Sequence, residues 1–300
     1  MAVRLPSCDD PFVARRIDEV TAVIKWFNAH QRDLPWRDAA VSPWGIVVSE
    51  FMLQQTQVDR VIPKWLDWMD RWPTPAHLAV ASPADVLRAW QGLGYPRRAM
   101  RLQACAQAIV NEFHGEVPSS EEDLLAMPGI GHYTAAAICA FAFHQPTVVL
   151  DTNIRRVIER AWSAKAMPTA HLTKPEIERA TALVRDHDGA RWSAAVMELG
   201  AIVCTARNPR CDQCPLQTSC AWFAAGKPDN APVRRKQPSF AGSDRQARGA
   251  LLRAVSASAV ATPSAIEAAW ADALQREKAM TSLINDGLVI RVARGYCLPK

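Results

Sequence analysis

The sequence lacks any long apolar run. No stretch of its 300 residues approaches the roughly 20 apolar residues that a helix needs to cross a bilayer. Residues 1–16 hold no apolar segment of the signal-peptide type, and Asp9 and Asp10 disfavour a transit peptide. We therefore expect a soluble, cytoplasmic protein that contacts no membrane.

Alternating strand patterns are absent before residue 285, and no segment repeats with a period of roughly 20–50 residues. Apolar residues instead recur at helical spacing, as in residues 17–27. Ser42-Pro43 and Ser82-Pro83 look like helix starts, with a serine cap and proline at the first position. The pattern predicts helices over 43–58, from 83 to before Gly92, and over 97–114, 132–143, 152–162, 175–187 and 190–203, with a capping box at Ser119 and Glu122.

No charge of one sign dominates either. Lys and Arg number 35 and Asp and Glu 30, so the formal net charge of +5 says little about nucleic acid. Small basic clusters are typical of solvated faces and also of phosphate contacts. They occur at Arg97, Arg98 and Arg101, at Arg155 and Arg156, at Arg207 and Arg210, and at Arg234, Arg235 and Lys236.

Four cysteines, by contrast, gather within seventeen residues: Cys204, Cys211, Cys214 and Cys220, spaced C-x6-C-x2-C-x5-C. Four thiolates this close can enclose one compact centre, either an iron–sulfur cluster or a structural zinc ion. Zinc sites usually pair two CxxC motifs about 12–20 residues apart, and only one occurs here. The spacing favours a 4Fe-4S cluster. Zinc and disulfides are the alternatives, although nothing else suggests the oxidising compartment that disulfides need.

A change of composition follows the cysteines. Residues 226–243 contain three prolines, two glycines and a basic run, which is typical of a linker. Beyond it, the pattern predicts three helices (244–256, one from Pro263, and 274–286), a glycine stop at Gly287 and a hairpin over 288–298. Three helices and a hairpin outline a winged helix, which binds DNA in some proteins and packs against protein in others.

A glycine-containing turn, residues 127–131 (MPGIG), precedes a predicted helix. Such a turn points free backbone N–H groups outward and can bind phosphate directly or through a cation. Alone it is a weak signal. Asp151, at the start of another predicted helix, follows twenty residues later.

Together these features resemble the helix-hairpin-helix DNA glycosylases with an iron–sulfur cluster, which include endonuclease III and the adenine glycosylases of the MutY type. The resemblance spans residues 15–225. Its most discriminating segment is SEFMLQQTQV at 49–58, supported by Leu34–Arg37 (LPWR), Gly92–Tyr95 (GLGY) and Glu198–Gly200 (ELG).

The resemblance implies an all-α, two-lobed helix-hairpin-helix glycosylase fold with a 4Fe-4S cluster loop and a small C-terminal winged-helix-like module. Residues 1–34 with 145–225 would form the cluster lobe, and residues 35–144 a six-helix lobe containing the hairpin. A basic linker (226–243) and the module (244–300) would follow.

The resemblance also implies a chemistry. Adenine leaves through an oxocarbenium-like transition state, which needs an acid to protonate N7 and a carboxylate to face the cationic sugar. Glu50, inside an apolar helical stretch, would be the acid and then activate water. Asp151 would be the electrostatic stabiliser or a transient nucleophile. Endonuclease III has a strand-cleaving lysine where this chain has Tyr133, so we expect a monofunctional enzyme in which Tyr133 and Asn153 assist.

Extruding the base leaves a hole that must be filled. By resemblance, Gln54, Gln55 and Tyr95 fill it and contact the orphaned partner base. Gly129 and Gly131 of the hairpin would bind the DNA backbone. The adenine pocket would be lined by Arg32, Trp36, Leu53 and Gln55.

The chain departs from the family in two places. Ala194 stands where many members have a Gln or Glu that touches the base, and about sixty residues after Phe240 are too few for the oxidised-guanine reader domain of many members. We expect a monomer, nucleoid-associated if bacterial, that acts on double-stranded DNA. It would remove adenine opposite 8-oxoguanine or guanine and leave an abasic site. The alternatives are an endonuclease III-like or mismatch thymine glycosylase, and a non-enzymatic DNA-lesion or iron–sulfur binding protein.

Overall fold

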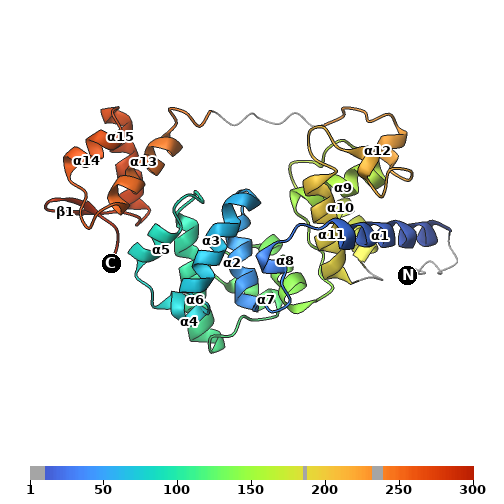
Figure 1. The fold of residues 1–300 in the computed structure, drawn as a ribbon, viewed down its shortest axis with the longest axis horizontal. Helices are drawn as coiled ribbons and strands as arrows, with labels where there is room; N and C mark the ends of the chain where they lie inside the picture. Colours follow the sequence, from blue (N-terminus) through green and yellow to red (C-terminus); the bar gives the residue numbers. More distant parts are fainter. Residues whose placement is uncertain (1–10, 185–187, 232–238) are drawn as a thin grey trace. The chain divides into compact units, whose positions relative to one another are not determined.

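A computed structural model of the chain describes residues 11–184, 188–231 and 239–300, with side chains from residue 18 onward. The described residues form fifteen α-helices and two short strands (Figure 1), so the prediction of an all-α fold is confirmed. None of the described helices combines the length and the apolar composition needed to span a bilayer.

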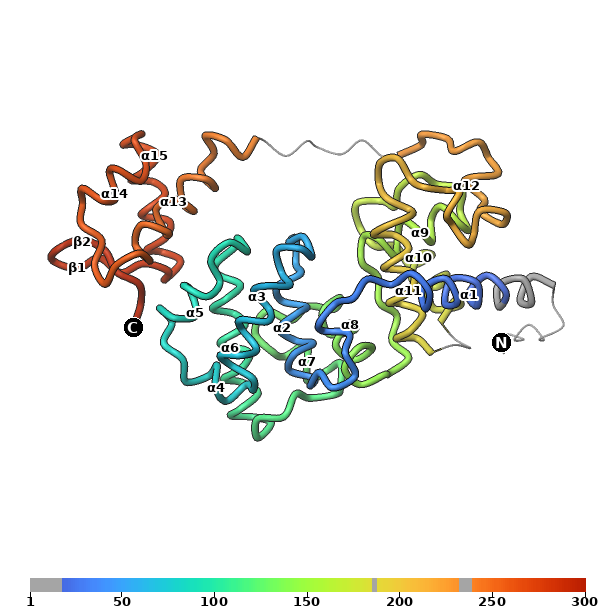
Figure 2. Tube along the Cα trace, viewed as in Figure 1, coloured from blue at the N-terminus to red at the C-terminus, as the bar shows by residue number. Residues whose placement is uncertain are grey.

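The chain divides into two compact units, and each unit joins two separate stretches of sequence, as the colours of Figure 2 show. The first unit comprises Met1–Asp33 and His132–Arg234. The second comprises Leu34–Gly131 and Arg235–Lys300. Positions 232–238, which include the basic run of the predicted linker, lie outside the described residues.

The first unit is a group of helices around one apolar core. Helix α1 packs against α11, and α11 packs against α9. Val20 and Phe27 of α1 meet Trp192 and Leu199 of α11 in a core that also holds Ile154 of α9, so the start of α9 is anchored firmly. The helices are α1 (Pro11–His30), α8 (His132–Phe143), α9 (Thr152–Ser163), α10 (Lys174–Val184), α11 (Gly189–Ile202), the 3-10 helix η2 (Cys211–Gln213) and α12 (Ala221–Ala224).

The Leu34–Gly131 part of the second unit is built around tryptophans. The ring centroid of Trp68 lies 4.6 Å from that of Trp72 and 5.4 Å from that of Trp90. Helix α2 is buried from residue 44 to residue 52, because α3 and α6 pack against it. The elements are η1 (Pro35–Arg37), α2 (Pro43–Leu53), α3 (Val58–Arg71), α4 (Pro75–Ala79), α5 (Pro83–Ala89), α6 (Arg97–Phe113) and α7 (Glu121–Ala126).

Serine caps begin three of these helices. Ser42 and Ser82 each accept a hydrogen bond from the backbone N–H three residues later, at 3.4 and 3.1 Å, and a proline follows each, as predicted. The predicted cap at Ser119 is wrong by one residue, since Ser120 caps α7. Adjacent serines followed by acidic residues offer the same local pattern in two registers. The complete burial of Leu124 in the core selects the register in which Ser120 is the cap.

The helix that starts at Ser42 ends earlier than predicted. Helix α2 stops at Leu53 rather than near Val58, where α3 begins instead. Gln55 between them has a φ of 55°, in the left-handed region that a right-handed helix cannot contain. Residues 54–57 are therefore a loop between two helices.

Residues 239–300 form the predicted three helices and hairpin. Helices α13 (Asp244–Ser256), α14 (Pro263–Ala269) and α15 (Ala273–Asn285) precede β1 (Ile290–Val292) and β2 (Gly295–Cys297), which pair antiparallel. Gly287 has a φ of 69°, as expected of a glycine that stops a helix. Leu87 of α5 belongs to the core of this segment, and Met100 of α6 packs on it. This segment therefore packs against the rest of the second unit.

Candidate active site and metal centre

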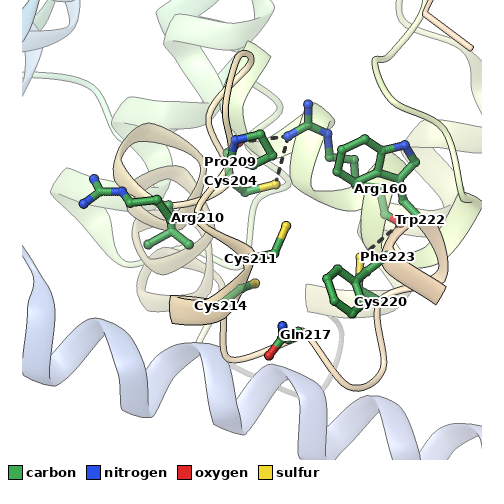
Figure 3. Close-up of a pocket in the computed structure, with 11 residues that line it drawn as sticks. Arg160, Cys204, Pro209, Arg210, Cys211, Cys214, Gln217, Cys220, Trp222 and Phe223 are labelled. Atoms are coloured by element: carbon green, nitrogen blue, oxygen red, sulfur yellow. Dashed lines mark hydrogen bonds between the residues drawn. The ribbon is translucent and has the colours of Figure 1, made fainter. Parts of the chain in front are cut away.

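Four cysteines of the first unit face one hollow. Cys204 follows α11, Cys211 and Cys214 lie at the two ends of η2, and Cys220 precedes α12. Figure 3 shows their sulfur atoms turned toward the same space, a partly open hollow that Arg160 also lines. All four are thiols, so the disulfide alternative is excluded.

The setting of the thiols favours a metal centre. Burial, and to a lesser extent the three neighbouring thiols, raises the pKa of the Cys214 thiol to about 12. Four thiolates can therefore coexist here only with the positive charge that metal ions supply. Four thiolate sulfurs are the donor set that an iron–sulfur cluster takes, so the residues present fit such a cluster.

Arg160 adds a fixed positive charge beside the cysteines. Its Nη1 donates to the Sγ of Cys204 at 3.4 Å and to the carbonyl oxygen of Thr205 at 2.8 Å. The ring centroid of Trp222 lies 4.4 Å from its guanidinium carbon. The guanidinium of Arg160 therefore lies against both the first cysteine of the set and the ring of Trp222.

Asp151 caps α9, as its position at a predicted helix start suggested. Its Oδ1 accepts the backbone N–H of Ile154 at 2.6 Å, and its Oδ2 accepts the Nδ2–H of Asn153 at 2.8 Å. Burial nevertheless has the largest effect and raises the pKa of Asp151. The hydrogen bonds and the charge of Arg156 only partly offset it. A negative charge in this setting is poorly screened and would interact strongly with a nearby cation.

Hydrogen bonds connect Asp151 with the cysteine site. Nη2 of Arg156 donates to Oδ1 of Asn153 at 2.8 Å, and Nε of Arg156 donates to the carbonyl oxygen of Cys204 at 2.8 Å. Arg156 is only 5% exposed, so its half of the Arg155-Arg156 cluster does not lie on a solvated face. One buried arginine thus holds both the partner of the carboxylate and the first cysteine.

The Glu198–Gly200 motif has two structural roles. A Cβ at Gly200 would lie 2.8 Å from the Cβ of Asn153, so glycine is what lets α11 approach α9 this closely. Arg156 also donates to the carbonyl oxygen of Gly200 at 2.7 Å. Glu198, fully buried, accepts two hydrogen bonds from the guanidinium of Arg32, at 2.8 and 2.9 Å.

The predicted hairpin, residues 127–131, lies directly before α8. Gly129 has a φ of 84°, and a Cβ there would lie 2.9 Å from the ring of Phe51, so glycine is required on both counts. Gly131 is exposed, with open space where a Cβ would stand. Tyr133 is half-buried in α8 and packs against the core of the first unit.

Glu50 lies near the end of α2 and is only 6% exposed. The flanking Phe51 is fully buried, and Leu53 at the end of the helix is half-buried. Trp36 is 8% exposed, and its ring meets that of Trp65 edge-on at 6.1 Å, so Trp36 packs in the core of the second unit.

The three residues expected to fill the hole lie in two loops of the second unit. Gln54 is half-buried, and Gln55 is exposed with a φ of 55°. Tyr95 is 51% exposed, with a φ of 47°. A left-handed backbone costs on the order of 1 kcal/mol or more at a residue with a side chain, so neighbouring groups must hold both loops.

The predicted site residues therefore fall into two sets. Arg32, Tyr133, Asp151, Asn153 and the four cysteines belong to the first unit, and the other eight belong to the second. Three buried arginines were not predicted from the sequence: Arg98 and Arg156, which belong to the basic clusters, and Arg160 beside the cysteines. Helical periodicity offered a signal at Arg98, because Leu102 and Ile109 follow on the same face of α6.

Comparison with known families gives two matches. Residues 48–182 match the HhH-GPD superfamily of base excision DNA repair proteins. Residues 204–220 match the iron-sulfur binding domain of endonuclease III. The second match begins and ends at cluster cysteines, which confirms the predicted 4Fe-4S cluster at Cys204, Cys211, Cys214 and Cys220.

Comparison with individual proteins also gives DNA glycosylases. The chain is 48% identical over 284 residues to an adenine DNA glycosylase of Mycobacterium tuberculosis, covering 93% of both chains. It is 41% identical over 219 residues to the adenine DNA glycosylase of Homo sapiens, covering 69% of this chain and 40% of the human one. Among solved structures, a thermostable thymine-DNA glycosylase aligns with a TM-score of 0.65 and 25% identity, over 72% of this chain and all of that one.

Proposed function

The chain belongs to the adenine DNA glycosylase family, within the HhH-GPD superfamily, and on that premise we propose that it hydrolyses adenine from DNA where adenine faces 8-oxoguanine or guanine. The product is an abasic site, and the strand stays intact. The observation that carries the proposal is the buried carboxyl group of Glu50, one helical turn before the glutamine pair.

Glu50 supplies the proton. Adenine is a poor leaving group until N7 is protonated, and a carboxyl group out of water is suited to donate that proton. The rigid, buried α2 fixes its position. After the base has left, the same carboxylate is placed to activate the attacking water.

Asp151 stabilises the cationic sugar. Burial makes the negative charge of Asp151 unfavourable before DNA binds, and it therefore raises the pKa of this carboxyl group. That cost is relieved when positive charge develops on the sugar, so the stabilisation is greatest in the transition state. Asn153 holds Oδ2 of Asp151 in place, and Arg156 in turn holds Asn153.

Tyr133 determines that the strand is not cut. Strand cleavage through a Schiff base needs an amine at this place, and a phenol cannot form one. Tyr133 instead packs on the core of the first unit, and its phenol offers a hydrogen-bonding group rather than a nucleophile.

The remaining residues bind the DNA. Gln54, Gln55 and Tyr95 fill the gap left by the extruded adenine and meet the opposite base. Arg32, Trp36 and Leu53 line the adenine pocket with Gln55, and the hairpin glycines Gly129 and Gly131 bind the backbone. The two exposed arginines of the cluster loop, Arg207 and Arg210, meet phosphates. Cys204, Cys211, Cys214 and Cys220 would hold the cluster, which would order that loop, while the carboxyl groups of Glu50 and Asp151 carry out the proton transfer and the charge stabilisation.

Base release distinguishes this function from its alternatives. Single-turnover rates are measured on duplexes with A:8-oxoguanine, A:G and T:G pairs. Release of adenine from the first two, with nicks only after alkali, is the expected result. Release of thymine from T:G would favour the thymine glycosylase alternative. Efficient borohydride trapping of the protein on DNA would contradict the monofunctional reading of Tyr133.

A further inference from the structure

Arg98 of α6 binds the end of the helix that carries Glu50. Its Nη1 donates to the carbonyl oxygens of Phe51 at 3.0 Å and Met52 at 3.3 Å, and also to that of Gln54. Carbonyl groups in the last turn of a helix have no backbone N–H partner within that helix. Arg98 supplies the missing donor and ends α2 immediately before Gln55.

The same side chain supports Tyr95. The guanidinium carbon of Arg98 lies 5.3 Å from the ring centroid of Tyr95 and 5.9 Å from that of Trp90, within the range of cation–π attraction. The backbone N–H of Arg98 also donates to the carbonyl oxygen of Tyr95 at 2.8 Å. One residue therefore contacts both the loop of Gln55 and the loop of Tyr95, and each of these two residues has a left-handed backbone.

Thr56 provides a second, uncharged connection between the loops. Its hydroxyl lies 3.2 Å from the carbonyl oxygen of Gln54 and 3.2 Å from that of Leu93. Leu93 belongs to the GLGY segment, and Gln54 belongs to the glutamine loop. The two loops are thus joined at two independent points.

The environment of Arg98 is unusual for a cation. Its side chain is 7% exposed, and within the described residues it donates only to main-chain carbonyl oxygens, with no carboxylate opposite it. Burial lowers the pKa of Arg98, and the nearby Tyr95 opposes this to a smaller extent. A buried charge without a counter-charge weakens the fold, so its placement calls for a reason beyond packing.

Building on the proposed function, we propose that Arg98 is a positioning residue that sets the Gln54–Gln55 loop and Tyr95 as one rigid surface against the base opposite adenine. That surface determines the preference for 8-oxoguanine over guanine. The chemistry at Glu50 and Asp151 does not require it.

The first test is the ratio of single-turnover rates on A:8-oxoguanine and A:G duplexes. In Arg98→Gln we expect the ratio to fall by about 10- to 100-fold, the scale of a 1 Å misplacement, with a smaller loss of the A:G rate. Arg98→Lys should recover part of the ratio, and Thr56→Val should lower it without any change of charge. Arg101→Gln, which removes an exposed charge from the same helix, is the matched control and should leave the ratio unchanged.

The second test does not depend on activity. Amide hydrogen exchange is measured for the segments 53–57 and 92–96. In Arg98→Gln both segments should exchange faster together, while the cluster absorbance of the first unit stays unchanged. If wild-type protein releases no adenine, the proposed function fails, but this coupled exchange would still show the joint role of Arg98.

Two results overturn the inference. One is an Arg98→Gln protein that keeps both the wild-type ratio and the wild-type exchange of the two segments. The other is faster exchange confined to one segment, which would make Arg98 an ordinary helix cap. Should Arg98→Gln fail to fold, Arg98→Lys and Thr56→Val decide by the same criteria, and wild-type behaviour in both would refute the inference.

Discussion

Arg32 and the fully buried Glu198 form a two-pronged ion pair, with Nε 2.8 Å from Oε1 and Nη2 2.9 Å from Oε2. The backbone N–H of Arg32 donates to the same Oε1 at 2.9 Å. The pair joins the segment after α1 to α11 within the first unit. A buried carboxylate is tolerated only where such partners compensate its charge. Arg32 therefore supports the first unit, whatever else it does in the adenine pocket.

Arg32→Ala should destabilise the protein by roughly 3 kcal/mol, because it leaves Glu198 charged and buried without its cation. Arg32→Lys should lose less, since an ammonium group keeps the charge but cannot make the two parallel bonds. The double variant Arg32→Ala, Glu198→Gln should regain much of the loss. Urea unfolding measures all four proteins. Equal losses in the single and double variants would show that the ion pair is not the cause.

Glu50→Gln should bind A:8-oxoguanine duplexes almost as tightly as the wild type but release adenine about 10²- to 10⁴-fold more slowly, because an amide cannot donate the proton to N7. Glu122→Gln, at an exposed position of the same unit, is the control and should keep its rate. Binding is read from a gel-shift titration and release from single-turnover kinetics. A near-normal release rate would remove Glu50 from the role of acid.

Asp151→Asn should abolish most adenine release while making the protein no less stable at neutral pH. Since the folded-state pKa of Asp151 is raised above 3.8, the folded protein binds this proton more tightly than the unfolded chain does. The protonated carboxyl group of Asp151 therefore makes its full contribution to the free energy of unfolding below pH 3.8. That contribution is lost as the pH rises through the folded-state pKa. Asp151→Asn does not lose stability in this pH range, because asparagine does not ionise.

The measurement is urea unfolding of both proteins at successive pH values. The difference in unfolding free energy should move in favour of Asp151→Asn as the pH rises through that window, and it should be constant above it. A difference that moves the other way would mean that the hydrogen bonds to Asp151 outweigh its burial.

The cluster should contain about four irons per chain when the protein is isolated without oxidation. Chelation of the iron should disorder the loop of Arg207 and Arg210 and weaken binding to any duplex, whatever its mispair. The slope of log affinity against log salt concentration should become shallower by roughly two units. The double variant Arg207→Ala, Arg210→Ala should show the same change. Stoichiometric zinc without iron in active protein would contradict this.

A chain that ends at Ser243 should keep its cluster and its adenine release but unfold at a lower urea concentration. Leu87, which is 1% exposed, would become exposed to solvent. Burial of a leucine side chain stabilises the folded state by about 1.5–3 kcal/mol. The ion pair of Arg97 with Asp286, at 3.3 Å, would also be lost. Leu87→Ser should cost stability in the full chain and almost none in the shortened one. An equal cost in both would show that the C-terminal helices do not cover Leu87.

Local sequence signals predicted the elements that depend on local chemistry. Ser42-Pro43 and Ser82-Pro83 begin helices because capping and the fixed φ of proline need no distant partner. The four cysteines could be assigned from spacing alone for a similar reason, since the loop that holds them is continuous in sequence.

The end of α2 could not be predicted in this way. Nothing in Leu53-Gln54-Gln55 forbids a helix, and it is Arg98, more than forty residues away, that takes the last carbonyl groups. The close approach at Gly200 likewise depends on Asn153 from another helix. Such long-range contacts are outside the reach of periodicity and capping rules.

Helix α1 is the first part of the first unit to leave the ribosome, and its partner α11 is among the last. Roughly 160 residues separate them, so at about 5–20 residues per second the gap is on the order of 10–30 s. During that interval Val20, Val23 and Phe27 cannot reach the core that finally buries them. Chains stalled before α11 should be cut by protease within residues 18–30, and chains stalled after residue 240 should resist. Helix α1 therefore waits for its packing partner through most of the synthesis of the first unit, and it becomes protected as the cysteines of the cluster loop emerge.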